Sequence, residues 1–240
     1  PVLHERLAAD SRLLTIWVSD GTHQRAVKIF PTEESPVAAV GSSFLTTSDT
    51  VYFAVRDSEE YTSLWKTDGT REGTVRIQQI PSADILAAVP FRDRIYILAV
   101  LMRQSPGYHY AEFQLWATDG SIGNLELVKA IPAKSYRPYS FWGAQLRATP
   151  DALYFGAEDM EHGYEMWKSD GTPEGTAMLR DINPGEADGY YPGADVRFPV
   201  TTTLGNVIYF MADSGATGCE LWRSDGTQAG TYMVKDICPG

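Results

Sequence analysis

Aromatic rings and carboxylates gather in four short, variable segments of the sequence, and together they are the groups that a sugar-binding site uses. An aromatic ring stacks on the C–H face of a sugar, while carboxylates and amides bind its hydroxyl groups. The alternative for any single tyrosine is that it packs a loop onto the body of the protein. The candidate ligand-binding residues are Tyr108, Tyr110, Tyr136, Tyr139, Trp142, His162, Tyr164, Tyr190, Tyr191 and Asp195.

Carboxylates in the same segments could also hydrolyse a glycosidic bond. A glycoside hydrolase needs carboxyl groups that converge on one pocket, about 5–9.5 Å apart. The candidates are Asp159, Glu161, Asp188 and Asp195. The regular repeat described below favours multivalent binding or a scaffold over one catalytic centre. The sequence therefore favours a non-enzymatic function and assigns no catalytic residue.

A metal centre is the third kind of chemistry to consider. His162 lies close to Glu161 and Asp159 in the sequence, but neighbouring residues are not spaced to converge on one metal ion. Acidic loops also permit Ca²⁺, which prefers clustered carboxylate and carbonyl oxygens, although no EF-hand spacing is present. The sequence requires no cofactor and leaves Ca²⁺ open as a structural support.

The elements that must position these segments follow a tandem repeat. The motif Trp-x-Ser/Thr-Asp-Gly occurs five times, and its copies start 48 to 55 residues apart. An apolar run and a proline follow each copy, and a strand-like segment with tyrosine recurs about 20 residues later. The repeats cover approximately residues 1–31, 32–81, 82–132, 133–184 and 185–240. Because internal periods of this length indicate repeat architectures, the repeat decides the fold prediction.

The aspartates of the motif are predicted to hold a hairpin turn rather than to bind a ligand. An aspartate accepts backbone N–H groups two residues on, and the following glycine supplies a positive φ. One active site would not need five copies. The structural turn residues are Asp20, Asp68, Asp119, Asp170 and Asp225. Glu165 and Glu220, two residues before a motif tryptophan, are predicted to cap backbone rather than catalyse.

The tryptophans of the motif are predicted to pack between neighbouring repeats. A tryptophan side chain buries about 150–250 Å², so five of them contribute heavily to a core. They are Trp17, Trp65, Trp116, Trp167 and Trp222.

Each repeat contains three or four short runs of β-branched and aromatic residues separated by Gly, Asp, Ser and Pro, which is typical of strands and turns. Four strands in about 50 residues make one blade of a β-propeller. The sequence predicts an all-β chain in which residues 1–240 form a single propeller domain of five four-stranded blades. The first repeat lacks its innermost strand, so the alternative is a fragment of a larger propeller.

The best copies resemble the ELWxxDGT repeat found in tandem in large secreted or surface-attached bacterial proteins. The resemblance rests on the segment from Glu220 through Trp222 to Gly240 and on the copy that starts at Glu165. The turn is also similar to the Asp-box of sialidase-type propellers, but the sialidase arginine triad cannot be placed. The family implies a propeller that is secreted or at the cell surface, and it implies no particular activity.

Composition limits the partners. The net charge is −11, and the 20 lysines and arginines are scattered singly. A nucleic-acid binder needs a basic patch, so nucleic acid is excluded, and a glycan or a surface protein is expected. The sequence contains no run of 18 apolar residues, so no transmembrane helix is predicted. The chain starts with Pro, which is typical of a mature product or an excised fragment.

Two cysteines lie at the two ends of the last hairpin. Cys219 precedes the fifth motif and Cys238 follows the strand after it. Their proximity permits a disulfide in an exported protein, and two independent buried thiols are the alternative.

Overall fold

The structure is a computed structural model, and it describes residues 2–7, 14–19, 26–30, 44–58, 61–81, 83–105, 108–133, 145–190 and 201–237. In the first three ranges, and at residues 44, 102–105 and 108–110, only the backbone is described. The chain divides into two compact units. One holds Pro1–Ile85 and Asp119–Leu125, and the other holds Leu86–Thr118 and Glu126–Gly240.

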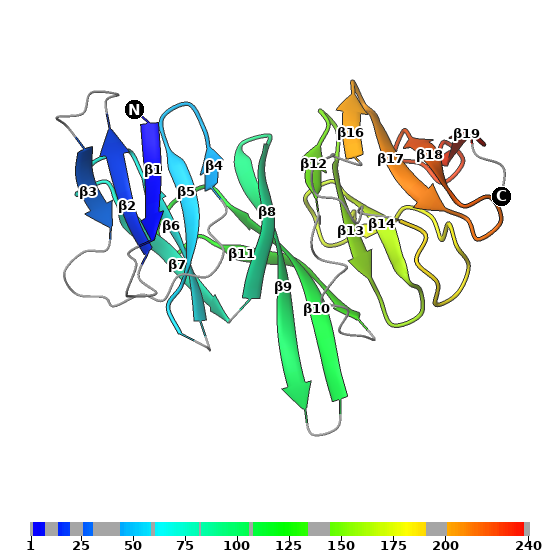
Figure 1. Ribbon diagram of the computed structural model, residues 1–240, viewed down its shortest axis with the longest axis horizontal. Helices are drawn as coiled ribbons and strands as arrows, with labels where there is room; N and C mark the ends of the chain where they lie inside the picture. The colour runs from blue at the N-terminus through cyan, green and yellow to red at the C-terminus, as the bar shows by residue number, and fades with distance from the viewer. Residues whose placement is uncertain are drawn as a thin grey trace. The chain divides into compact units, whose positions relative to one another are not determined.

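The fold is all-β, and the prediction of a β-propeller fold is confirmed. The described strands form five antiparallel sheets, and each sheet takes consecutive strands from one repeat. Figure 1 shows the strands of each sheet side by side. Each sheet is one blade. The strands of a four-stranded blade are named A to D in chain order.

The first blade has three strands among the described residues: β1 (Val2–Leu7), β2 (Leu14–Ser19) and β3 (Ala26–Phe30). Trp17 lies in β2 and pairs with His4 of β1, so β1 and β2 take the places of strands B and C. The absence of a strand A in the first repeat stays a prediction. The prediction of one domain with a closed ring concerns the placement of the two units and stays a prediction.

The other four blades each have four strands. The second blade contains β4 (Phe44–Thr46), β5 (Val51–Arg56), β6 (Tyr61–Thr67) and β7 (Val75–Pro81). The third contains β8 (Ala83–Phe91), β9 (Arg94–Ser105), β10 (Tyr108–Thr118) and β11 (Glu126–Ala133). The fourth contains β12 (Leu146–Ala148), β13 (Leu153–Glu158), β14 (Tyr164–Ser169) and β15 (Ala177–Met178). The fifth contains β16 (Thr201–Leu204), β17 (Val207–Asp213), β18 (Cys219–Ser224) and β19 (Tyr232–Lys235).

A β-bulge recurs at the motif tryptophan. The register between strands C and D shifts immediately before Trp17, Trp65, Trp116 and Trp222. A bulge places two residues opposite one and increases the local twist. The extra residue lies in strand D, as with Val128 between Leu127 and Lys129, and the sequence pattern did not predict it.

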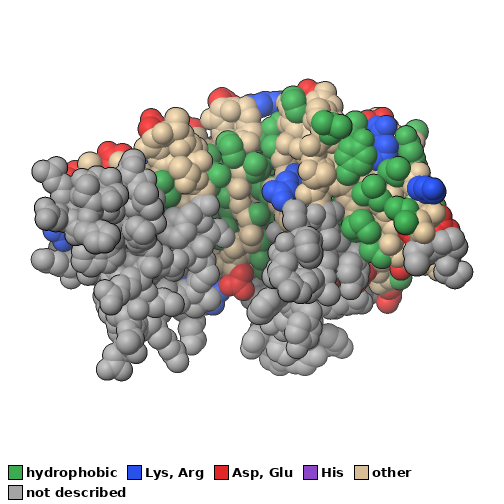
Figure 2. Space-filling view, turned by 45° about the horizontal axis from the view of Figure 1, so that its top comes forward, with side chains coloured by type: hydrophobic (Ala, Val, Ile, Leu, Met, Phe, Trp, Pro, Cys, Tyr) green, Lys and Arg blue, Asp and Glu red, His purple; other side chains and the backbone are tan. Residues whose placement is uncertain are grey.

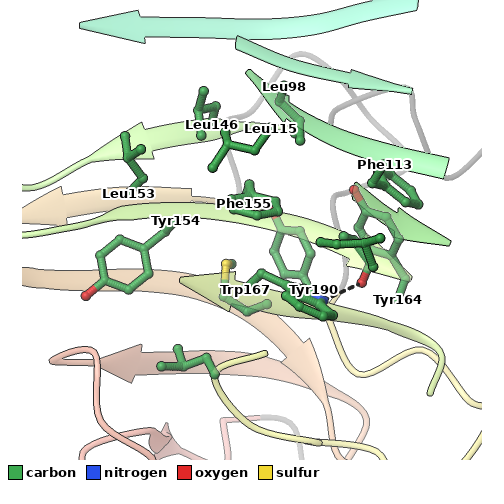
Figure 3. Close-up of a cluster of buried hydrophobic side chains, with 14 of the residues drawn as sticks. Leu98, Phe113, Leu115, Leu146, Leu153, Tyr154, Phe155, Tyr164, Trp167 and Tyr190 are labelled. Atoms are coloured by element: carbon green, nitrogen blue, oxygen red, sulfur yellow. Dashed lines mark hydrogen bonds between the residues drawn. The ribbon is translucent and has the colours of Figure 1, made fainter. Parts of the chain in front are cut away.

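The core of the second unit is one cluster of buried side chains from the third, fourth and fifth blades. Every residue of β13 is buried, because both faces of a central strand in the middle blade are covered. Figure 3 shows part of the cluster, with Leu98 and Leu115 from the third blade and Leu153, Phe155 and Trp167 from the fourth. Strand β17 instead alternates between buried and partly exposed residues.

The motif tryptophans are not equally buried. Trp167 and Trp222 belong to the core cluster and are 8% and 6% exposed. Trp65 and Trp116 are partly exposed, which differs from the expectation that all five fill the core. The side chain of Trp17 lies outside the described residues.

Candidate functional site

The two ends of the blades have different chemistry. One end carries the turns between strands C and D, and we call it the turn end. The other carries the loops between strands B and C and the connections from strand D to the next blade, and we call it the loop end.

At the turn end, the aspartate of the motif organises the hairpin through the same bonds in three blades. Oδ1 of Asp170 accepts the backbone N–H of Thr172 at 2.8 Å and its hydroxyl at 2.7 Å. Asp68 makes these bonds with Thr70 at 2.8 and 2.7 Å, and Asp225 makes them with Thr227 at 3.0 and 2.7 Å. The threonine hydroxyl bond and then the backbone bond lower the pKa of all three carboxyl groups. The hydrogen bonds within each turn therefore stabilise the charged form of its aspartate.

The hydroxyl groups that flank the turn complete the network. The hydroxyl groups of Ser169 and Thr176 lie 2.7 Å apart, and Ser169 Oγ also accepts the N–H of Gly171 at 3.0 Å. The corresponding bonds join Thr67 to Thr74 at 2.8 Å and Ser224 to Thr231 at 2.7 Å. These polar atoms are partnered locally, which leaves them little capacity to bind a ligand.

The third turn departs from the pattern of the other described turns. Asn124 stands where Gly175 stands in the fourth repeat, and its Nδ2 donates to Oδ2 of Asp119 at 2.9 Å. The N–H of Ser121 still donates to Oδ1 of Asp119 at 2.7 Å. A Cβ at Gly175 would lie 2.0 Å from Oδ1 of Asp170, and Gly73 and Gly230 have the same relation to Asp68 and Asp225, so the second, fourth and fifth turns need glycine there. Asp20 of the first turn lies outside the described residues.

A tyrosine from the preceding blade covers the first glycine of the turn. The hydroxyl oxygen of Tyr96 would lie 2.3 Å from a Cβ at Gly171, and that of Tyr154 would lie 2.7 Å from a Cβ at Gly226. Tyr52 has the same relation to Gly120 within the first unit, at 2.6 Å. Burial is the main cause that raises the pKa of these three tyrosines. The turn end therefore holds neighbouring blades together.

At the loop end of the fourth blade, the B–C loop meets the connection that follows strand D. Gly163 N donates to Gly185 O at 3.1 Å, and Tyr164 N donates to Asp188 Oδ1 at 2.9 Å. Two of the four variable segments are thus brought together by direct bonds.

His162 is bound inside this loop. Its Nδ1 lies 3.0 Å from both carboxylate oxygens of Asp159, and its Nε2 lies 3.9 Å from Oδ2 of Asp181. The Asp159 hydrogen bond raises the pKa of His162, against a smaller opposing effect of burial. Burial also acts to raise the pKa of Asp159, but the bonds from Glu161 N, His162 N and the imidazole outweigh it and lower that pKa. The predicted ligand-binding residue His162 therefore forms an ion pair that closes the loop.

Glu165 fastens the end of strand D to this loop. Its side chain is 0% exposed, and Oε1 accepts the N–H of Asn183 at 3.3 Å. Burial raises the pKa of Glu165 to about 8, partly offset by backbone N–H groups of Asn183, Ile182 and Gly189. In the fifth blade, Glu220 Oε2 accepts Ile237 N at 3.0 Å. Both bonds fit the predicted backbone-capping role.

Two predicted ligand-binding tyrosines lie in the core. Tyr164 and Tyr190 are each 1% exposed, and their rings are stacked with centroids 5.7 Å apart. The ring of Phe113 packs against Tyr164 at 5.8 Å, and that of Phe210 packs against Tyr190 at 6.0 Å. Figure 3 shows Phe113, Tyr164 and Tyr190. Neither tyrosine presents a ring face to a ligand. This corrects the expectation for both residues, and the packing alternative describes them instead.

The loop end of the second blade holds an exposed aromatic ring that the sequence analysis missed. Tyr61 begins β6 and is 46% exposed. Asp57, in the B–C loop of the same blade, accepts the side-chain amide of Gln79 at 2.7 Å and the hydroxyl of Ser63. Arg56 and Asp84 form an ion pair. The sequence signal was a tyrosine at the start of strand C.

The other predicted ligand-binding residues are not described at the level of side chains. Tyr108 and Tyr110 lie at the start of β10, and only the backbone of residues 108–110 is described. Tyr136, Tyr139, Trp142, Tyr191 and Asp195 lie outside the described residues, as does Cys238. Cys219 is exposed, and burial of part of its side chain raises the pKa of its thiol. The disulfide stays a prediction.

Within the described ranges, no group of three or more His, Cys, Asp or Glu side chains is arranged to hold a metal ion. The same ranges contain no helix of the length and apolar character that would span a membrane. The prediction of bound Ca²⁺ stays a prediction.

The comparisons with known proteins agree on the fold. No protein-family model and no curated protein matches the chain. Among solved structures, the β-propeller domain of the Trilobed protease from Pyrococcus furiosus, which has an open velcro topology, matches with a TM-score of 0.52 at 14% identity, over 98% of this chain and 66% of that one. A puromycin hydrolase matches with a TM-score of 0.56 at 12% identity, over 95% of this chain. This chain spans 34% of the length of that hydrolase. Identities this low show the propeller fold alone.

Proposed function

We propose that this chain is a non-enzymatic binding module that takes a carbohydrate at the loop end of its blades. The observation that carries the proposal is the exposed ring of Tyr61 beside polar side chains at the loop end of the second blade. Variable loops on a rigid scaffold are where binding sites are usually found. The resemblance to the ELWxxDGT repeat supports placing the module outside the cell or on its surface.

The chemistry around Tyr61 suits a sugar. Tyr61 is 46% exposed, and an exposed aromatic ring can stack on the C–H groups of a sugar. Asp57 and Gln79 already bond to each other and present carboxylate and amide groups in a fixed arrangement. Arg56, held by Asp84, adds donors to the same loop end. Fixed polar groups around an aromatic ring give orientation and specificity to a bound ligand.

The alternative is a glycoside hydrolase, which needs two carboxyl groups that reach the substrate. Asp159 accepts the N–H groups of Glu161 and His162, and Asp188 accepts that of Tyr164, so both carboxylates hold loops. Glu165 has the raised pKa of a general acid, but it is 0% exposed. These features support binding over hydrolysis.

A glycan array and a glycosidase screen test the proposal on the same protein sample. We expect binding to at least one glycan class and no turnover. Tyr61→Ala should weaken that binding by about tenfold or more, since loss of a stacking ring costs about 1–2 kcal/mol. Tyr232→Ala is the matched control, because Tyr232 is also 46% exposed but lies in β19 of the last blade.

Each other outcome assigns a different function. Turnover without stable binding would establish the hydrolase. If the sample shows neither binding nor turnover, a protein-interaction scaffold is the function that is left. Equal losses in Tyr61→Ala and Tyr232→Ala would remove the second blade from the site.

A further inference from the structure

The imidazole of His162 lies between two carboxylates that come from different segments of the fourth blade. Its Nδ1 lies 3.0 Å from both oxygens of Asp159, which belongs to the same B–C loop. Its Nε2 lies 3.9 Å from Oδ2 of Asp181, which belongs to the connection after β15. All three side chains are partly exposed, so the ring can exchange its proton with solvent.

A single proton on this ring cannot serve both carboxylates. A neutral imidazole has an N–H on one nitrogen and a lone pair on the other, whereas the imidazolium donates from both nitrogens. With the proton on Nδ1, the bond to Asp159 is kept and the lone pair of Nε2 faces the carboxylate of Asp181. With the proton on Nε2, the bond to Asp159 is lost. Only the charged ring attracts both segments at once.

The carboxylate of Asp181 depends on the charged ring more than that of Asp159 does. Asp159 also accepts the N–H groups of Glu161 and His162. By contrast, Oδ1 of Asp181 is buried and accepts no hydrogen bond from the described residues. Burial is the main cause that raises the pKa of Glu165, and the charge of Asp181 adds to it. Loss of the ring charge therefore weakens the hold on the connection first.

The charges around His162 favour its protonated form. The acidic side chains that face it are Asp159 and Glu161 from its own loop and Asp181 from the connection, and the hydrogen bond to Asp159 is the main cause that raises the pKa of His162. The chain has a net charge of −11, and Figure 2 shows Asp and Glu side chains at several places on the surface. A negative field stabilises a cation. The ring therefore stays charged at pH 6.5 and releases its proton at a higher pH.

The fifth blade has hydroxyl groups in place of this ion pair. Thr217 stands at the position of His162 and Ser214 at that of Asp159, and the two hydroxyl oxygens lie 3.3 Å apart. Hydroxyl groups of serine and threonine do not titrate near neutral pH. The loop at residues 213–218 is thus an internal reference for the loop that contains His162.

We propose that His162 is a pH-sensitive latch at the loop end of the fourth blade. The protonated ring holds the B–C loop against the connection, together with the backbone bond from Gly163 N to Gly185 O. When the ring loses its proton, it no longer attracts Asp181, and the loop opens more often. Because the latch lies in a variable loop, its opening changes the shape of the loop end with pH.

Hydrogen exchange of the whole chain, measured by mass spectrometry, tests the latch without a ligand. The ratio of the intrinsic exchange rate to the observed rate at each pH gives a protection factor. We expect the protection of residues 159–164 to fall about threefold to tenfold between pH 5.5 and pH 8.5. The protection of residues 213–218 should stay constant. Glu165→Gln removes a second titrating group beside Asp181, and the fall should persist in this variant.

Two substitutions of His162 fix the charge at this position. His162→Lys stays charged over the whole range and should keep the loop protected at both pH values, whereas His162→Gln is neutral and should leave it weakly protected at both. Asp159→Asn keeps an oxygen for the N–H groups of the loop but removes the charge, so the fall should move to lower pH.

Two results would overturn the proposal. Equal protection of the wild-type loop at pH 5.5 and pH 8.5 would show that the ring is no latch. A fall that persists in His162→Gln would assign the titration to another group.

Discussion

The turn end and the loop end of the blades are built from the same repeats, yet they differ in how their polar groups are used. At the turn end, Asp68, Asp170 and Asp225 make the same bonds to a threonine two residues on. At the loop end, the fourth blade has a His162–Asp159 pair where the fifth has Thr217 and Ser214, whose hydroxyl oxygens lie 3.3 Å apart. The turn end repeats its chemistry, and the loop end varies it.

The difference teaches where each kind of constraint acts. A turn that must accept a tyrosine from the preceding blade tolerates little change, because the glycine and the aspartate are fixed by close contacts. At the loop end, the B–C loop of the fourth blade bonds to the connection after strand D through Gly163 and Tyr164, and no motif glycine or aspartate is involved. The loop end can therefore carry different side chains from blade to blade, which is what a binding surface needs.

The largest expected effect separates the two ends with one pair of variants. Gly171 at the turn end and Gly185 at the loop end both have a φ of 98°. Gly171→Ala should cost about 3–4 kcal/mol, because it adds a clash with Tyr96 to the backbone strain. Gly185→Ala meets no atom within 4 Å and should cost about 1 kcal/mol. Urea unfolding measures both free energies, and equal costs would contradict the role of the tyrosine contact.

The buried carboxyl group of the loop end should make stability depend on pH. Burial raises the pKa of Glu165 from 4.5 to about 8, so the folded state binds a proton that the unfolded state releases. Its contribution is greatest below pH 4.5 and is lost as the pH rises toward 8. Between pH 5 and pH 8, the free energy of unfolding of the wild type should fall. In Glu165→Gln this fall should be about 2–3 kcal/mol smaller. Unfolding in urea at both pH values tests this, and parallel profiles would show that Glu165 titrates normally.

The turn-end aspartate should affect stability and not binding. Asp170→Ala removes the acceptor for the N–H and hydroxyl of Thr172, and we expect the melting temperature to fall by about 2–5 °C. Asp93→Ala, at an exposed position in the turn between β8 and β9, should shift it by less than about 1 °C. Glycan affinity measured well below melting should be unchanged in both. Lost affinity in folded Asp170→Ala would make the turn part of the site.

Much of the blade architecture could be predicted from the spacing of the motif. The strand-C tryptophan, the Ser/Thr-Asp-Gly turn and the apolar run after it define a hairpin, and five copies define the blades. The fourth blade has the four strands that one repeat was predicted to supply, although strand D is limited to Ala177–Met178. Local hydrogen bonding and period-two patterning decide these features, so they are visible in a short window of sequence.

The site was harder to predict because exposure is not a local property. Tyr164 and Tyr61 both stand at the start of a strand C, and both are tyrosines in polar surroundings. Tyr164 is 1% exposed since aromatic side chains of the third and fifth blades flank its stack with Tyr190, whereas Tyr61 is 46% exposed. The sequence predicted a ligand-binding role for Tyr164 and did not single out Tyr61.

By itself, the sequence determined the repeat, the strand order within a blade and the chemistry of the turns, because each depends on residues that are close along the chain. Only the tertiary structure decided which side chains of the repeat are buried. Ile182 and Ile237 occupy the same repeat position and differ from 5% to 67% in exposure. The cause is the neighbouring blade, which a single repeat does not encode.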